Sequence, residues 1–325
     1  MRRREVIAGV AATTVGPLAG RAQQQIPVIG FLGAASAKAF EPRLIPLRQA
    51  LKDAGFIEGE NVRIEYRWVE AQYERLPALV AELVRMPVTV IVAAGGAQTA
   101  LAAKSATAKI PIVFQNGSDP VKIGLVASLN RPGGNVTGVT NVSVETAAKR
   151  LELMRELVPT AAVLGWMLNP RNPNTEAIAK DVERAAAALG RKIVFANFAK
   201  RSDLDLAFAT LVQQGAQALV VSADPIFTNW RDELIKGAAY HKLPTMLPDR
   251  TFVEVGGLAS YGSNYSDVYR EVGAYVARIL KGERPAELPV VQSTKYELIV
   301  NNKTARALGL EVPLSFLMRI DAVID

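Results

Sequence analysis

Carboxylate and amide side chains follow several apolar runs of this chain, where they could bind a ligand with polar groups. Asp119 lies in Asn116-Gly117-Ser118-Asp119-Pro120, and Asp224 lies in Ser222-Ala223-Asp224-Pro225. A carboxylate in such a loop can bind an ammonium group or accept hydrogen bonds from hydroxyl groups. Asp-Pro is also an ordinary helix start, so each aspartate has a purely local interpretation as well.

A second kind of loop is built from small residues and suits an anion. Gly95-Gly96-Ala97 and Asn172-Pro173-Asn174 each stand before a predicted helix. The first N–H groups of a helix have no partner within it and attract negative charge, so either turn could bind a carboxylate. The predicted ligand-binding residues are Ser36, Gly96, Ala97, Gln98, Asn116 and Asp119 on one wall, with Asn174, Asp224, Tyr261 and Asn264 on the other wall or its hinge.

Aromatic residues near these loops could stack on a ligand ring, although most such residues serve as core or rim residues. Of the candidates, we expect only Tyr261 to reach the ligand. The others are Tyr265, Trp230, Phe227 and Trp68.

The motifs of common enzymes are absent from the sequence. It contains no G-x-x-x-x-G-K-[ST], G-x-S-x-G or H-E-x-x-H, and Gly95-Gly96-Ala97-Gln98-Thr99 lacks the G-x-G-x-x-G spacing. Histidine occurs once, at His241, and cysteine is absent, which argues against histidine triads, histidine-rich metal sites, thiol catalysis and disulfides. We therefore expect a protein that is not an enzyme and needs no cofactor or metal.

The elements that must position these loops form two similar series. Predicted strands begin near Val28, Val62, Val88 and Ile110, and again near Ala162, Lys192, Ala218 and Pro244. Equivalent strands start about 130 residues apart, with amphipathic helical runs between them. The order of the elements repeats, although the residues do not match.

This alternation predicts an α/β fold with two doubly wound lobes. Strands joined by helical crossovers run parallel, and runs such as VTVIVAA and ALVVSA suit strands that are buried on both faces. In such sheets ligands bind outside the carboxyl ends of the strands. The polar loops named above stand at those ends, and we expect them to converge from both lobes on one cleft.

The first residues of the chain indicate export. Arg2-Arg3-Arg4 precedes a short apolar run that ends in Gly20-Arg21-Ala22, which predicts a cleaved twin-arginine signal over residues 1–22. Four arginines and one glutamate in this segment account for +3 of the formal charge of +7. No cluster of lysine or arginine in the remainder suggests nucleic-acid binding, and no run is long enough to insert in a membrane.

Several segments give the chain a family resemblance. They are Pro27-Val-Ile-Gly-Phe-Leu32, Arg131-Pro-Gly-Gly-Asn-Val-Thr-Gly-Val-Thr140, Tyr261-Gly-Ser-Asn-Tyr265, Ile279-Leu-Lys-Gly-Glu-Arg-Pro-Ala-Glu-Leu-Pro-Val290 and Lys295-Tyr-Glu-Leu-Ile-Val-Asn-Asn-Lys-Thr-Ala-Arg-Ala-Leu-Gly-Leu310. With them the chain resembles the substrate-binding proteins of bacterial ABC transporters, in the group that includes the tryptophan/tyrosine-type binding proteins. Relatives that bind aromatic amino acids often show Gly-Thr after the third strand, where this chain has Gly95-Gly96.

The resemblance implies the type I periplasmic binding-protein fold, with three hinge passages near 140–141, 260–261 and 291–294. Lobe one is then 23–141 plus 262–292, and lobe two is 142–261 plus 293–325. The implied function is a monomeric periplasmic receptor that captures a small polar or carboxylated molecule, such as an amino acid or an aromatic acid. It would deliver this molecule to the permease subunits of an ABC transporter.

Two alternatives stay open. One is an exported α/β hydrolase that uses a cleft aspartate, Asp119 or Asp224. The other is a ligand sensor that acts on a signalling partner.

Overall fold

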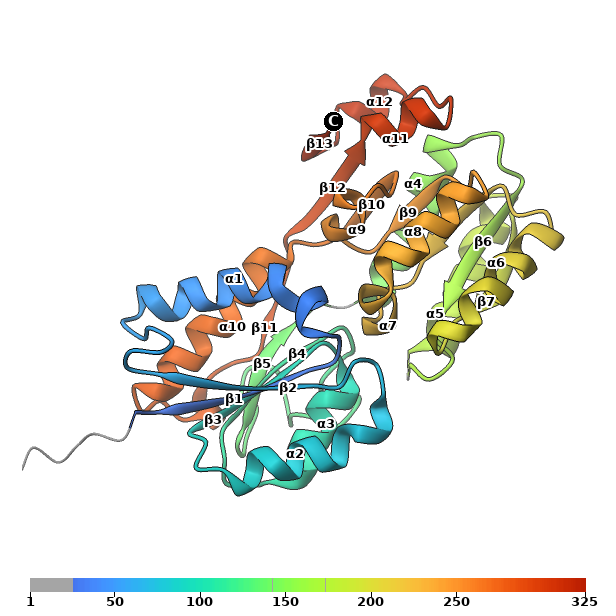
Figure 1. The fold of residues 1–325 in the computed structure, drawn as a ribbon. Helices are drawn as coiled ribbons and strands as arrows, with labels where there is room; N and C mark the ends of the chain where they lie inside the picture. The colour runs from blue at the N-terminus through green and yellow to red at the C-terminus, as the bar shows by residue number, and fades with distance from the viewer. Residues whose placement is uncertain (1–25, 142, 173) are drawn as a thin grey trace, which may run out of the picture.

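Two sheets, one wholly parallel and one mainly parallel, are each covered by helices on both faces (Figure 1). The computed structural model describes residues 26–141, 143–172 and 174–325. The predicted export signal at 1–22 and Pro173 of the predicted anion-binding turn lie outside the described residues. No helix within the described ranges is long and apolar enough to cross a membrane.

The first sheet has the strand order β11-β5-β4-β3-β1-β2, and every pair in it is parallel. Its strands are β1 (Val28–Gly33), β2 (Arg63–Trp68), β3 (Val90–Ala94), β4 (Ile112–Asn116), β5 (Val136–Thr140) and β11 (Val291–Gln292). Helices α1 (Ala37–Asp53) and α10 (Tyr265–Leu280) cover one face, and α2 (Leu76–Arg85) and α3 (Ala97–Ala106) cover the other.

The second sheet has the order β13-β12-β10-β9-β8-β6-β7. Its strands are β6 (Val163–Leu168), β7 (Lys192–Asn197), β8 (Ala218–Val221), β9 (Thr245–Leu247), β10 (Ala259–Ser263), β12 (Tyr296–Asn301) and β13 (Ala322–Ile324). Its helices are α4 (Ser143–Leu157), α5 (Thr175–Ala188), α6 (Leu204–Gln213), α7 (Pro225–Asn229), α8 (Arg231–Tyr240), α9 (Arg250–Glu254), α11 (Asn302–Ala307) and α12 (Leu314–Leu317). Strand β12 is antiparallel to β10, which departs from the wholly parallel prediction, because β12 enters this sheet from the other lobe instead of through a helical crossover.

The chain crosses between the sheets three times. It passes from β5 to α4, from β10 to α10 and from β11 to β12. We call the part built on the first sheet, with α1, α2, α3 and α10, lobe one, and the part built on the second sheet lobe two. The predicted boundary between residues 261 and 262 falls inside β10, which pairs with β12 as far as Ser263.

Helix α1 is held close to α10 although some 220 residues separate the two in sequence. Ser36 caps α1 by accepting a hydrogen bond from the Ala39 N–H, at 3.4 Å. Gly273 gives α10 the space for the contact, since a Cβ atom there would lie 2.6 Å from the carbonyl oxygen of Leu47. This packing fixes the first turns of both helices at the same edge of lobe one, where the chain crosses to lobe two.

Candidate functional site

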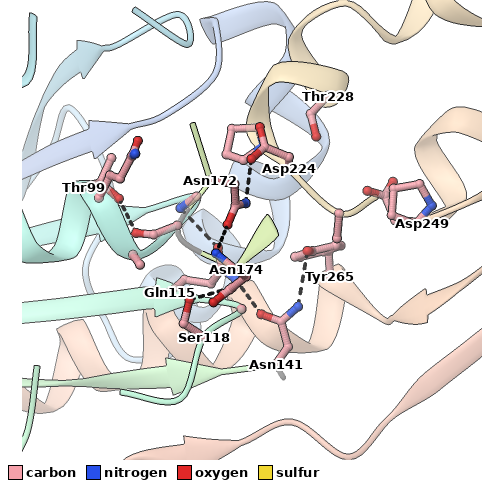
Figure 2. Close-up of a pocket in the computed structure, with 18 of the residues that line it drawn as sticks. Thr99, Gln115, Ser118, Asn141, Asn172, Asn174, Asp224, Thr228, Asp249 and Tyr265 are labelled. Carbon is pink, nitrogen blue, oxygen red and sulfur yellow. Dashed lines mark hydrogen bonds between the residues drawn. The ribbon is translucent and has the colours of Figure 1, made fainter. Parts of the chain in front are cut away.

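A cleft lies between the lobes, at the carboxyl ends of the strands (Figure 2). Both lobes line it, so a molecule held there would contact both. The lining residues of lobe one are Phe40, Arg43, Tyr73, Gly95, Gly96, Ala97, Gln98, Thr99, Gln115, Gly117, Ser118 and Tyr265, with Asn141 at the first crossing. Those of lobe two are Asn172, Asn174, Ala223, Asp224, Pro225, Thr228, Pro248 and Asp249.

The turn after β3 brings the backbone of lobe one close to the cleft. Gly95 and Gly96 have φ values of 95° and 142°, which residues other than glycine rarely adopt. The N–H of Gly95 donates to Oε1 of Gln115 at 3.1 Å, and the hydroxyl of Thr99 donates to the carbonyl oxygen of Gly96 at 2.7 Å. Helix α3 therefore begins at the cleft, and its first N–H groups stand at the cleft wall.

A chain of polar side chains forms the floor beside the crossings. Nε2 of Gln115 donates to Oδ1 of Asn141 at 2.7 Å, and Nδ2 of Asn141 donates to the Tyr265 hydroxyl at 3.3 Å. The hydroxyl of Tyr269 donates to Oε1 of Gln115 at 3.0 Å. These bonds tie β4 to the first and second crossings, so the position of the floor depends on the position of the hinge.

Asp224 is the buried carboxylate of the lobe two wall, at 7% exposure. Its oxygens accept hydrogen bonds from Nδ2 of Asn169 at 3.0 Å, from Nδ2 of Asn172 at 2.7 Å and from the N–H of Ile226 at 2.8 Å. Burial raises the pKa of Asp224 more than these donors lower it. Among the described residues, no lysine or arginine forms an ion pair with it, so its charge is balanced by dipoles alone.

Tyr73 of lobe one lies in the same cleft, where the charge of Asp224 acts on its hydroxyl. Burial raises the pKa of the Tyr73 hydroxyl well above its ordinary value, and the negative charge of Asp224 raises it further. The hydroxyl is therefore neutral at all physiological pH values and able to donate a hydrogen bond.

A buried ion pair between the lobes closes the other end of the cleft. Nη2 of Arg43, on α1, lies 3.1 Å from Oδ2 of Asp249, which caps α9. The Arg43 guanidinium also lies 4.5 Å from the ring centroid of Tyr265, in a cation–π contact. Burial is the largest single effect and acts to lower the pKa of Arg43, but the combined effects of Asp249, Tyr265 and Tyr269 raise the pKa overall.

Further contacts hold the two lobes together over the cleft. Nδ2 of Asn174 donates to the Ser118 hydroxyl at 2.8 Å, and Nε2 of Gln98 donates to the carbonyl oxygen of Arg171 at 2.9 Å. The N–H of Ser36 donates to Oδ1 of Asn229 at 3.0 Å. Hydrogen bonds that join different lobes at several points indicate a closed arrangement.

The structure brings half of the ten predicted site residues to the cleft. These are Gly96, Ala97, Gln98, Asn174 and Asp224.

The other five lie outside the cleft lining. Ser36 caps α1, and Asn116 is buried with its Oδ1 bonded to the N–H of Ser118. Asp119 is exposed and binds the N–H groups that follow it in its own turn. Tyr261 stacks on Tyr296 beside the core of lobe two, and Asn264 caps α10.

Sequence reasoning missed the residues that the hinge and α1 bring to the site, above all Arg43, Asp249 and Tyr265. Tyr265 stands in the same Tyr261-Gly-Ser-Asn-Tyr265 segment as Tyr261 and was assigned to the core or rim. The signal that separates the two is local: Tyr261 is inside β10, whereas Tyr265 follows the helix cap Asn264. Arg43 carries no such signal, because its burial depends on a lobe that joins it from 206 residues away.

Metal binding has no support in the described part of the chain, where no three His, Cys, Asp or Glu side chains gather as a metal ion requires. The polar groups of the cleft are instead amides, hydroxyls, two carboxylates and one guanidinium. They can hold a small molecule by hydrogen bonds and charge.

Comparison with solved structures shows the same two-lobed fold in proteins of several bacteria. A conserved domain protein from Vibrio cholerae has a TM-score of 0.84 at 27% identity, covering 92% of this chain and 100% of that one. An ABC domain in complex with L-Trp from Streptococcus pneumoniae has a TM-score of 0.82 at 24% identity, covering 92% and 99%. The ligand-free, open structure of a Clostridium difficile substrate-binding protein with adhesive properties has a lower TM-score of 0.64 at 29% identity, with the same coverage.

Comparison of sequences identifies the family. The tyrosine-binding protein of Clostridioides difficile (strain R20291) is 28% identical over 264 residues, which cover 81% of this chain and 75% of that protein. The family model of the ABC transporter substrate binding protein matches residues 25–324. The chain therefore belongs to the ABC transporter substrate-binding protein family.

Proposed function

We propose that this protein captures a free amino acid, with both its ammonium and its carboxylate groups charged, and delivers it to an ABC permease. One observation carries the proposal: Asp224 is a buried carboxylate in the cleft wall with no cationic partner among the described side chains. A buried charge without a counter-ion is unfavourable. An ammonium group of the ligand supplies the missing positive charge.

The opposite wall suits the other end of such a molecule. The first N–H groups of α3, at Ala97 and Gln98, stand at the cleft without partners within the helix, and the Ser118 hydroxyl lies on the same wall. A carboxylate there accepts hydrogen bonds and interacts favourably with the helix dipole. Capture thus places the two charged ends of the ligand on different lobes, so both are satisfied only when the lobes close.

The relatives suggest which amino acids to test first. One is named a tyrosine-binding protein, and one similar structure holds L-Trp. The cleft of this chain also presents Tyr73, Phe40 and Tyr265, whose rings can pack against an aromatic side chain. We propose L-tyrosine and L-tryptophan as the leading ligands, in a protein that residues 1–22 direct to the periplasm.

A thermal-shift screen tests the proposal, with the free amino acids set against L-tryptophan methyl ester and N-acetyl-L-tryptophan. A ligand at a hundred times its Kd stabilises the folded state by about 2.7 kcal/mol, which raises the melting temperature by a few degrees. We expect a shift with the free amino acid and a much smaller one with either blocked form. Mass spectrometry of the recovered ligand separates a receptor from a hydrolase, since a receptor returns it unchanged. Equal shifts with the free amino acid, the methyl ester and the N-acetyl compound would show that neither the ammonium nor the carboxylate group is recognised.

A further inference from the structure

A second buried arginine, Arg150, belongs to lobe two, and no carboxylate among the described side chains forms an ion pair with it. Arg150, on α4, is 1% exposed. Its Nη1 donates to the backbone oxygen of Tyr261 at 3.4 Å, while its Nε and Nη2 have no hydrogen-bond partner in the described part of the chain. An unsatisfied buried guanidinium is unfavourable, so the closed arrangement contains a strained charge.

Asp249 belongs to the same lobe as Arg150 and acts on it electrostatically. Helix α4 packs on β9 and β10, and Asp249 follows β9 by two residues. The charge of Asp249 raises the pKa of Arg150, although burial dominates and lowers it to about 10. Arg150 and Asp249 both belong to lobe two, so they stay together when the lobes separate. Arg43 moves away with lobe one.

We infer that Asp249 exchanges partners as the lobes move: it pairs with Arg43 when they are closed and with Arg150 when they are open. In the open arrangement the exchange satisfies Arg150, and it keeps a cation beside Asp249 after Arg43 has moved away. Arg150 therefore favours the open form. It sets the affinity of ligand capture without lining the cleft, because the ligand must overcome this preference before the lobes can close.

Substitution of the two arginines separates this exchange from a general loss of charge. Arg150→Met removes the open-state partner and the strained closed-state charge, so we expect more of the closed form. Arg43→Met removes the closed-state partner, so we expect more of the open form. The two changes delete the same group beside the same carboxylate, yet their effects have opposite signs. Arg150→Lys keeps a cation for Asp249 and is the matched control, expected to resemble the parent.

The experiment measures lobe separation without ligand, so its result does not depend on the proposed amino acid. The chain has no native cysteine, and Lys109→Cys with Lys236→Cys places spin labels on exposed positions of the two lobes. Pulsed electron spin resonance on the full chain then gives the inter-lobe distances. If Arg150→Met does not fold, Arg150→Gln removes the charge with a smaller change in polarity.

The expected result is a shift to shorter distances for Arg150→Met or Arg150→Gln and to longer distances for Arg43→Met. With L-tryptophan as the probe, affinity should then rise about fivefold or more in the Arg150 variants. Unchanged distances, or distances that move the same way in both sets of variants, would overturn the exchange. Failure of L-tryptophan to bind any variant would count against the proposed ligand and leave the distance result valid.

Discussion

Asp224 and Asp119 carry the same chemical group in opposite surroundings. Asp224 is 7% exposed and is held by two asparagine amides, whereas Asp119 is exposed at the surface and binds only its own turn. Both stand before a proline in a polar loop, so the sequence does not distinguish them. The difference in their burial depends on tertiary packing, which local patterns do not encode.

These two aspartates form a matched pair for testing the ammonium subsite. Asp224→Asn should weaken amino-acid binding more than tenfold, about 1.4 kcal/mol, because it deletes the charge that faces the ammonium group. Asp119→Asn keeps the oxygen that caps its turn and should leave affinity unchanged. Isothermal titration calorimetry measures both. Equal affinities in the two variants would contradict the assignment of Asp224.

The raised pKa of Asp224 predicts how binding depends on pH. Only the ionised carboxylate holds an ammonium group, so affinity should fall as the pH decreases through a value above the ordinary 3.8. The stability of the ligand-free protein should change in the opposite sense. Because the folded-state pKa is raised, the contribution of Asp224 is present at low pH and is lost as the pH rises through that value. Titrations at several pH values, with Asp224→Asn as the control, should show both trends in the parent and neither in the variant.

At the scale of elements, the alternation of apolar and amphipathic runs predicts the fold well, because the apolar runs form strands that are buried on both faces of a sheet. The two-lobed α/β fold was predicted from them, and the similar structures confirm it. The antiparallel pairing of β12 with β10 was missed, since a strand that returns from the other lobe carries no helical crossover to mark it. The burial of Arg43 was missed too, because α1 looks like an ordinary amphipathic helix until α10 and lobe two are placed beside it.

The contact between α1 and α10 depends on one glycine and can be tested there. A Cβ atom at Gly273 would lie 2.6 Å from the carbonyl oxygen of Leu47 and 2.9 Å from Cβ of Ala50. Gly273→Ala should therefore destabilise the fold by roughly 1–3 kcal/mol, measured by urea unfolding. Helix propensity alone predicts the reverse sign, a gain of about 0.5–1 kcal/mol. A variant as stable as the parent would show that the two helices are further apart.

At the scale of the molecule, closure should appear as coupling between residues that belong to different lobes. Ser118 and Asn174 share a hydrogen bond over the cleft. In a double-mutant cycle on ligand binding, Ser118→Ala and Asn174→Ala should couple by about 1 kcal/mol.

Asn229 provides the matched control for this cycle, because it accepts a bond between the lobes from the Ser36 N–H and shares none with Ser118. Ser118→Ala and Asn229→Ala should add to within about 0.5 kcal/mol. Coupling of equal size in both cycles would show that the coupling does not come from the Ser118–Asn174 bond.

Closure also has a thermal consequence, which follows from Ala71. This residue lies in the turn after β2 of lobe one, yet it is 6% exposed and belongs to an apolar core cluster of lobe two. Opening the lobes removes Ala71 from this cluster and exposes the surrounding apolar surface to solvent, whichever ligand is bound. Capture should therefore have a more negative heat capacity change than the ligand's own apolar area accounts for, so that its enthalpy becomes more favourable on warming.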